Sequence, residues 1–182
     1  MFQTLIAQRR SIRRYLEKPI EPEKIDVLVE TALRSPSSMG SNPWEFVFVT
    51  DRDLLEKLAK SKPHGSSFLR YAALGIVICA DPKKSDVWTE DASIASIYLQ
   101  LAAEDLDLGS CWVQIRNRMH DEATTAEAYL AKLLKIPSGM AIESIIAVGY
   151  PERRKPPHAK DELEWEKVYL NTYGRSYPTS ST

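Results

Sequence analysis

The sequence predicts one α+β domain in which four strands alternate with amphipathic helices. The chain has 182 residues and 43% hydrophobic composition, which is enough to build one substantial core. Four apolar runs have strand character, and the segments between them repeat apolar residues at spacings of three and four. We find no internal repeat and no second boundary. Residues 1–182 are therefore expected to form a single domain, with 152–182 as a charged, proline-rich tail.

Two helices are expected before the first strand. A short helix begins near Phe2 and ends at an arginine-rich run, and a second begins at Pro22, a residue favoured at the first helical position. Its apolar stripe ends near Arg34, because Pro36 disfavours helical geometry in the residue before it.

Two strands and a helix follow the polar segment 35–43. The run 44–50 is rich in aromatic and β-branched residues, and 74–80 has the continuous apolar character of a central strand. Between them, a helix capped by Asp51 or Asp53 is expected to extend to about Lys60.

The longest and most buried helix is expected from Glu90 to Leu106, with Gly109 as its stop. Two sets of residues follow its helical spacing. The larger side chains are Ile94, Ile97, Tyr98, Leu101 and Ala102, and the small residues that permit close approach of another helix are Ala92, Ala95 and Ala103.

The remaining elements alternate in the same way. A strand is expected at 111–115, followed by a helix that starts at Asp121 and stops at Pro137, and then by the last central strand at 142–149. The tail carries aromatic residues four apart. These aromatics favour packing on the same subunit or on a partner, and disorder is the alternative.

The charge balance excludes several classes of partner. Lys and Arg total 24 against 25 Asp and Glu, so no excess positive charge would attract nucleic acid or an anionic membrane. No apolar stretch reaches membrane-spanning length, and the first apolar stretch is too short for a signal peptide. Cys79 and Cys111 lie in apolar runs, which favours two free thiols in a reducing compartment. We expect a cytoplasmic protein with a small-molecule partner.

Two basic clusters are the strongest candidates for a binding site. Segment 9–14 contains four arginines and Ser11, and a bound phosphate monoester would offset the repulsion between the guanidinium groups. A solvated basic surface at a helix carboxyl end is the alternative. The second cluster, 153–155, could close on the same phosphate. Neither a P-loop nor a dinucleotide-binding glycine pattern is present, so anion binding would depend on side chains.

Metal and thiol chemistry are not favoured. His64, His120 and His158 are scattered and lack the paired spacing of a zinc site, so no metal is expected. A nucleophilic pair of Cys111 and His120 is disfavoured, because an apolar strand raises rather than lowers a thiol pKa.

Four segments in order resemble the nitroreductase family of FMN (flavin mononucleotide) enzymes. The opening run 9–15 resembles the phosphate-binding start of that family, and 32–44, 108–112 and 148–151 resemble its flavin-contact loop, the strand after its long helix and its last strand. The resemblance extends from about Phe2 to Lys155. It implies a nitroreductase-like fold, with αβα layers around a mainly antiparallel sheet of about four strands and a further strand from a partner's tail.

The resemblance also implies three groups of FMN contacts. Side chains would hold the phosphate and ribityl chain, a loop from the other subunit or the same cleft would border the ring, and backbone groups would face the flavin edge beside N5. These groups are, respectively, Arg9, Arg10, Ser11 and Arg13 with Arg154 or Lys155; Pro36, Ser37, Ser38, Met39 and Asn42; and Gln114 with Ile115. Many family members have glycine in the segment where this chain has Gln114 and Ile115. The register at 153–158 is ambiguous, and the loop alone would be interpreted as an ordinary turn.

The implied function is electron transfer from NAD(P)H to a small electrophile such as a nitroaromatic or a quinone. Flavin N5 would carry the chemistry in a two-step, ping-pong exchange, so no catalytic side chain is required. Such enzymes work as homodimers. A non-catalytic module that stores or senses FMN is the alternative, and Trp112 is interpreted as a core residue.

Overall fold

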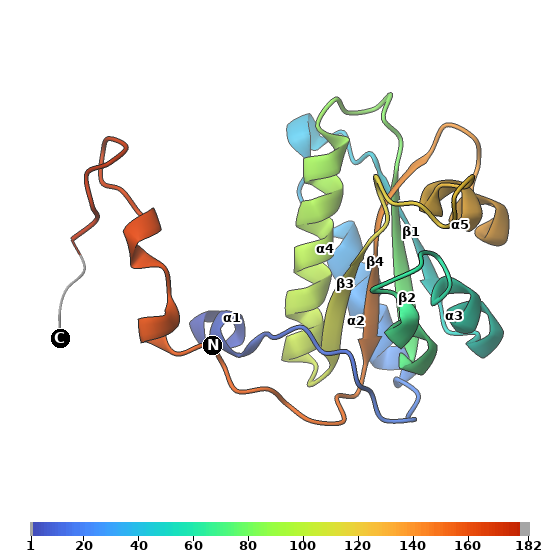
Figure 1. Ribbon diagram of the computed structural model, residues 1–182, viewed down its shortest axis with the longest axis horizontal. Coiled ribbons are helices and arrows are strands. Elements are labelled where there is room, and N and C mark those ends of the chain that lie inside the picture. Colours follow the sequence, from blue (N-terminus) through green and yellow to red (C-terminus); the bar gives the residue numbers. More distant parts are fainter. Residues whose placement is uncertain (1, 179–182) are drawn as a thin grey trace.

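The computed structural model describes residues 2–178 and confirms an α+β fold (Figure 1). One antiparallel four-stranded sheet has the order β1-β2-β4-β3, so β1 and β3 form its edges. The strands are β1 (Trp44–Val49), β2 (Leu74–Ala80), β3 (Gly109–Gln114) and β4 (Ala141–Gly149). The helices are α1 (Phe2–Gln8), α2 (Pro22–Leu33), α3 (Arg52–Leu58), α4 (Trp88–Asp105) and α5 (Ala126–Leu134).

Helices cover both faces of the sheet and produce the expected three layers. On β2, Ile76 and Ile78 join α2 and α4 in one core, whereas Val77 joins α3 and α5 in the other. This division follows from the alternation of side chains along a strand. Both faces of β2 are buried, as its continuous apolar run predicted. Within residues 2–178, no helix is long and apolar enough to cross a bilayer.

Helix α4 is the longest helix, as predicted, and its small residues rather than its large ones form the most buried side. Its small-residue side faces the sheet and α2, where Ala92 and Ala95 are fully buried. The larger residues Ile94, Ile97 and Tyr98 remain 37%, 39% and 41% exposed. Close packing on the sheet selects alanine, so the outer side of α4 at these three residues is an apolar surface that stays partly exposed within residues 2–178.

Two helix boundaries differ from the sequence predictions. Asp107, at φ 63°, takes the left-handed conformation after α4, whereas Gly109 already lies in β3. Helix α5 is capped by Thr125, whose hydroxyl accepts from the Ala128 N–H at 3.1 Å. Asp121 instead closes the preceding turn by accepting from two backbone N–H groups, because a short acidic side chain bonds equally well to a local loop.

The remaining boundaries agree closely with the predictions. Asp51, not Asp53, caps α3 by accepting from the Leu54 N–H at 2.8 Å. Strand β3 begins two residues earlier than expected and ends at Gln114. The short 3-10 helix Ser67–Tyr71 before β2 was not predicted.

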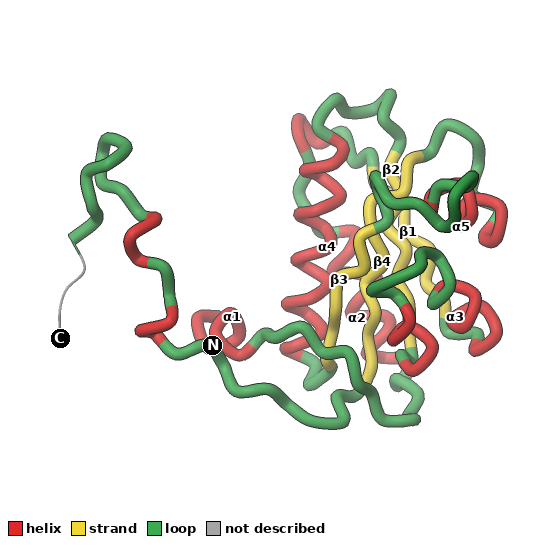
Figure 2. Tube along the Cα trace, viewed as in Figure 1, coloured by secondary structure: helices red, strands yellow, loops and turns green. Residues whose placement is uncertain are grey.

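The start of the tail packs on its own subunit, but the part beyond residue 160 does not. Beyond residue 160 it forms two short 3-10 helices, Lys160–Glu162 and Trp165–Lys167, and a turn bridged between Tyr169 and Ser176. This segment stands apart from the sheet and its helices (Figure 2), and Trp165, at 47%, is half exposed. For the segment beyond residue 160, packing on a partner and disorder are the expectations that this arrangement leaves open.

Candidate functional site

The arginine-rich segment is fastened to the sheet by backbone hydrogen bonds. Ser11 forms a parallel bridge with Ser110 of β3, and the Ile12 N–H donates to the Ser110 carbonyl at 2.9 Å. Four residues later, the Leu16 N–H donates to the Tyr150 carbonyl at 2.8 Å. The segment therefore crosses the ends of β3 and β4 in a fixed register.

Two glycines make this crossing possible. A Cβ at Gly109 would lie 2.9 Å from the Ile12 side chain, and one at Gly149 would lie 2.9 Å from the Tyr15 ring. The Tyr15 hydroxyl donates to the Ile12 carbonyl at 2.7 Å, and burial raises its pKa well above the usual range. Because Ile12 and Tyr15 fill the space beside the glycines, the side chains of Arg13 and Arg14 remain exposed.

The structure brings the two basic clusters together. The segment after β4 follows the start of the chain, as the Glu152 N–H donates to the Arg14 carbonyl at 3.1 Å (Figure 1). Lys155 Nζ donates to the Ser11 carbonyl at 3.0 Å, and Arg10 donates to the Pro156 carbonyl. Two cavities of about 140 Å³ and 400 Å³ share linings from both clusters.

The charges in this group are not equally available. Arg154 forms ion pairs with Glu104 and Asp107, both at 2.8 Å, which anchor it at the carboxyl end of α4. Over the described range 2–178, no ion pair involves Arg9, Arg10, Arg13, Arg14 or Lys155. Between the two alternatives at this position, the geometry favours Lys155 for contact with an anion and Arg154 for holding the segment in place.

Cys111 lies beside the same cluster. Burial raises the pKa of its thiol, while Arg13, Ser11 and Lys155 act in the opposite direction. Both cysteines of the chain are free and buried. A thiol with a raised pKa in an apolar strand is a poor nucleophile, so this residue contributes packing.

The outer edge of β3 offers a backbone donor near its end. The Ile115 N–H is already used, because it donates to the Glu143 carbonyl at 3.1 Å. Hydrogen-bonded and non-hydrogen-bonded pairs alternate along an antiparallel ladder, so the Gln114 N–H points away from β4 to the open edge. Of the two expected backbone donors, only that of Gln114 faces a ligand lying along β3.

The loop 36–42 is held in place by α4. The Ser38 N–H donates to Asp91 Oδ1 at 2.7 Å, and Ser37 Oγ accepts from the Asn42 N–H at 2.8 Å. Met39 and Asn42 both have positive φ, and the Met39 side chain is fully exposed. Pro36 and Ser38 are exposed as well.

One chain does not bring this loop to the basic cluster. The loop is anchored at Asp91 in the first turn of α4, and the cluster is anchored at Glu104 near its last residue. At 1.5 Å per residue, these anchors are about 20 Å apart along the helix. The expected site residues therefore form two separate groups in this chain.

The comparison with known families decides between the possible interpretations of this arrangement. A model of the family described as "Nitroreductase family" matches residues 6–64 and 60–150, which include the basic segment, the loop and all four strands. The chain belongs to the nitroreductase family. The resemblance read from four sequence motifs is thus confirmed.

Individual relatives agree with this placement. An FMN-dependent nitroreductase from Clostridium difficile superposes with a TM-score of 0.91 and 44% identity, covering 93% of this chain and 98% of that one. A protein of Archaeoglobus fulgidus, provisionally named NADH dehydrogenase/NAD(P)H nitroreductase, is 36% identical over 87% of this chain and 90% of its own length. An FMN reductase [NAD(P)H] from Bacillus subtilis is 24% identical over 91% of this chain and 73% of its own.

Sequence reasoning missed residues that position this nitroreductase site. Asp91 was not considered, although it is buried and tethers the loop. Trp112 is more than a core residue, because its indole Nε1 donates to Gln114 Oε1 at 2.9 Å. Glu143 was also passed over. A lone carboxylate in the otherwise apolar strand 142–149 was the signal that could have identified it.

Proposed function

We propose that this nitroreductase binds FMN and transfers electrons from NAD(P)H to a small electrophilic acceptor such as a nitroaromatic or a quinone. The observation that carries the proposal is the group of basic side chains beside the open edge of β3 that form no ion pair within residues 2–178. A phosphate monoester fits such a group, because arginine can grip its oxygens in a fork. Arg9, Arg10, Ser11, Arg13 and Lys155 would hold it.

The edge of β3 suits the flavin. A planar ring that extends from the phosphate along this strand meets the outward N–H of Gln114, which can donate to its edge. When bound, FMN supplies the hydride-accepting and hydride-donating chemistry of both half-reactions. The chain contributes position and charge, and Arg13 is placed to stabilise negative charge on the ring. NAD(P)H and acceptor use the same place in turn.

A second copy of the chain completes the site. The outer side of α4 exposes Ile94, Ile97 and Tyr98, and a cavity of about 650 Å³ lies between this surface and Phe2 of α1. When two copies pair these surfaces about a two-fold axis across the helix, the amino end of one α4 comes beside the carboxyl end of the other. The partner's loop 36–42 then reaches the basic cluster.

The tail contributes to the same assembly. The outer edge of β1 is unpaired, and apolar grooves flank it on both faces, one lined by Leu33 and Phe46 and the other by Val47 and Leu134. Aromatic residues of the partner's tail would cover such an edge. The free, buried cysteines suit a reducing compartment, in keeping with a cytoplasmic enzyme.

Anaerobic mixing of the FMN-loaded protein with NADH or NADPH tests the proposal. We expect the visible flavin absorbance to bleach, and addition of a nitroaromatic or a quinone to restore it. A protein that binds FMN but stays oxidised with both nucleotides would be the storage or sensing module instead. A protein that does not retain FMN would contradict both alternatives.

A further inference from the structure

Strand β4 contains a β-bulge at the end of the site. Ile78 of β2 pairs with Ser144, whereas the next residue, Cys79, pairs with Ile142, so Glu143 has no partner on β2. A bulge of this kind redirects the extra side chain and breaks the alternation of the strand. A carboxylate is thereby buried within the sheet, on a strand whose neighbouring residues are mostly apolar.

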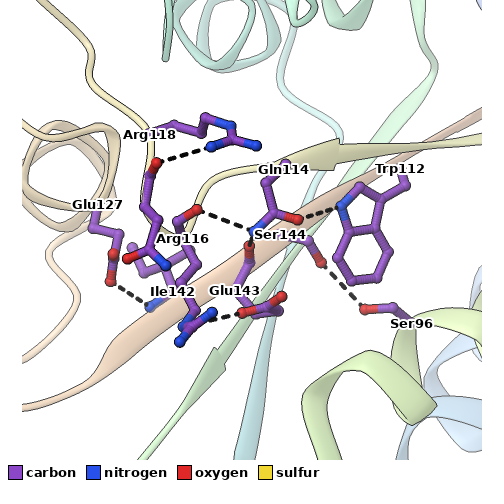
Figure 3. Close-up of polar contacts among 10 residues, drawn as sticks. Ser96, Trp112, Gln114, Arg116, Arg118, Glu127, Ile142, Glu143 and Ser144 are labelled. Carbon is purple, nitrogen blue, oxygen red and sulfur yellow. Dashed lines mark hydrogen bonds and ion pairs between the residues drawn. The ribbon is translucent and has the colours of Figure 1, made fainter. Parts of the chain in front are cut away.

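Glu143 is buried without full compensation. The residue is only 4% exposed, and no described residue forms a hydrogen bond with its Oε2 atom. Arg116 Nε lies 3.9 Å from that oxygen, too far for a hydrogen bond but close enough for charge attraction (Figure 3). Burial raises the pKa of Glu143, Gln114 and Arg116 oppose that shift, and the carboxylates of Glu127 on α5 and Glu90 on α4 reinforce it.

The same residue fixes the turn that ends β3. Its carbonyl accepts from the N–H groups of Ile115 and Arg116 at 3.1 Å and 3.0 Å. Gln114 Nε2 donates to the Arg116 carbonyl at 3.1 Å and makes a longer 3.5 Å contact with the Glu143 carbonyl. These bonds fix the backbone next to Gln114 and therefore the direction of its N–H. Figure 3 shows Gln114 between Trp112 on one side and Glu143 with Arg116 on the other.

We propose that Glu143 is a positioning residue that acts through Gln114 and Arg116: its backbone carbonyl holds the turn that orients the outward N–H of β3, and its carboxyl places one ionisable charge behind the flavin edge. The proposal rests on the proposed function, since Gln114 matters for the reaction only if FMN lies along β3. Glu143 does not touch the ligand itself.

The proposal has an electrostatic consequence for bound FMN. An ionised Glu143 disfavours additional negative charge on a nearby ring, so it lowers the midpoint potential of the flavin. Glu143→Gln keeps the shape and removes the charge. We expect its potential to match the wild type at acidic pH and to exceed it at alkaline pH. A tenfold change in relative affinity for the reduced ligand corresponds to about 30 mV for two electrons.

The orientation itself is measurable without FMN. In ¹⁵N-labelled apo-protein, the backbone and side-chain amide signals of Gln114 should shift with pH, with a midpoint above the ordinary range of a glutamate. The shift should vanish in Glu143→Gln. Glu90→Gln is the matched control, because it removes a neighbouring carboxylate that forms no hydrogen bond with Gln114 within residues 2–178, and it should keep the titration.

Each result has a defined meaning. Gln114 signals that do not titrate in the wild type, or that titrate equally in Glu143→Gln, would overturn the proposal. So would identical midpoint potentials in the two proteins at every pH, provided that both retain FMN. Loss of FMN binding by the wild type would refute the proposed function instead, and the amide titration would still report on Glu143 separately. A circular dichroism spectrum unchanged by the substitution verifies the fold.

Discussion

The two ends of α4 differ in how completely one chain builds them. At the carboxyl end, Arg154 is paired with Glu104, and the basic segment is fastened by backbone bonds to β3 and β4. At the amino end, the loop 36–42 is tethered through Asp91 but leaves Met39 fully exposed. The apolar side of α4 connects the two ends. We therefore propose that the phosphate end is complete within a subunit, whereas the ring end needs the loop of a second one.

The largest expected effect comes from breaking the phosphate end. Arg13→Glu should weaken FMN binding at least about 100-fold, because it removes a charge-assisted contact worth roughly 1.5–3 kcal/mol and adds repulsion. Quenching of FMN fluorescence measures the dissociation constant. Arg34→Glu is the control, since Arg34 is an exposed residue directly after α2, and its one ion pair within residues 2–178 is with Glu30. Equal affinities in the two variants would remove the phosphate assignment.

A smaller effect is expected from the surface that connects the two ends. Ile97→Glu places a charge in the middle of the exposed side of α4 and should convert a dimer into monomers, because burying an unpaired carboxylate is unfavourable. FMN affinity should fall about tenfold with it. Sedimentation velocity measures the assembly. Val27→Glu, on the exposed side of α2, is the control and should leave the dimer intact; a dimeric Ile97→Glu protein would show that the copies meet elsewhere.

The ring end should respond more weakly still. Ser37→Ala removes the hydroxyl that accepts from the Asn42 N–H and loosens the loop. One such bond is worth about 1 kcal/mol, so we expect roughly a fivefold loss of FMN affinity. The melting temperature should change little, because the loop is exposed. Unchanged affinity together with an ordered loop would contradict a role in flavin contact.

The smallest expected effect is on thermal stability at acidic pH, through the hydrogen bond that joins Tyr150, after β4, to Glu21 at the start of α2. Tyr150 donates to Glu21, and Lys18 lies 3.0 Å from the same carboxylate, so the pKa of Glu21 is lowered from 4.5 to about 2. A lowered pKa stabilises the fold above the ordinary value, and this contribution is lost as the pH falls from 4.5 towards 2. Glu21→Gln should therefore melt below the wild type at pH 6, and the difference should shrink by pH 3.

Thermal melts of both proteins across this range provide the measurement. Glu23→Gln is the matched control in the same first turn of α2, where no hydrogen bond or ion pair to the side chain occurs within residues 2–178. A constant difference between Glu21→Gln and the wild type from pH 6 to pH 3 would show that the network does not act through the charge of Glu21.

The sequence predicted the order of elements because that order depends on local patterns, whereas the layers were implied by the family resemblance. Period-two and helical spacing identify strands and helices directly, and Pro22 and Asp51 mark helix starts by well-understood rules. The pattern could not show which side of α4 faces the sheet. Both sides are apolar, and close packing rather than hydrophobicity decided in favour of Ala92 and Ala95.

The site was predictable where charge is concentrated in the chain and not where it depends on tertiary pairing. The composition of the run 9–14 predicts a candidate anion-binding site. The division of labour between Arg154 and Lys155 depends on Glu104, which is fifty residues away. The bulge at Glu143 depends on the register of β2 against β4, which no local sequence pattern encodes.

The central claim is that each FMN site combines the basic cluster of one chain with the loop 36–42 of another. The most direct test purifies a heterodimer, with different tags, of an Arg13→Glu copy and a Ser38→Glu copy, in which the second change repels Asp91 and displaces the loop. The Arg13→Glu homodimer should lack FMN, the Ser38→Glu homodimer should bind it about tenfold more weakly than the wild type, and the heterodimer, with one undamaged site, should bind a single FMN tightly. A heterodimer that binds none, or a Ser38→Glu homodimer that binds FMN as tightly as the wild type, would contradict the shared site.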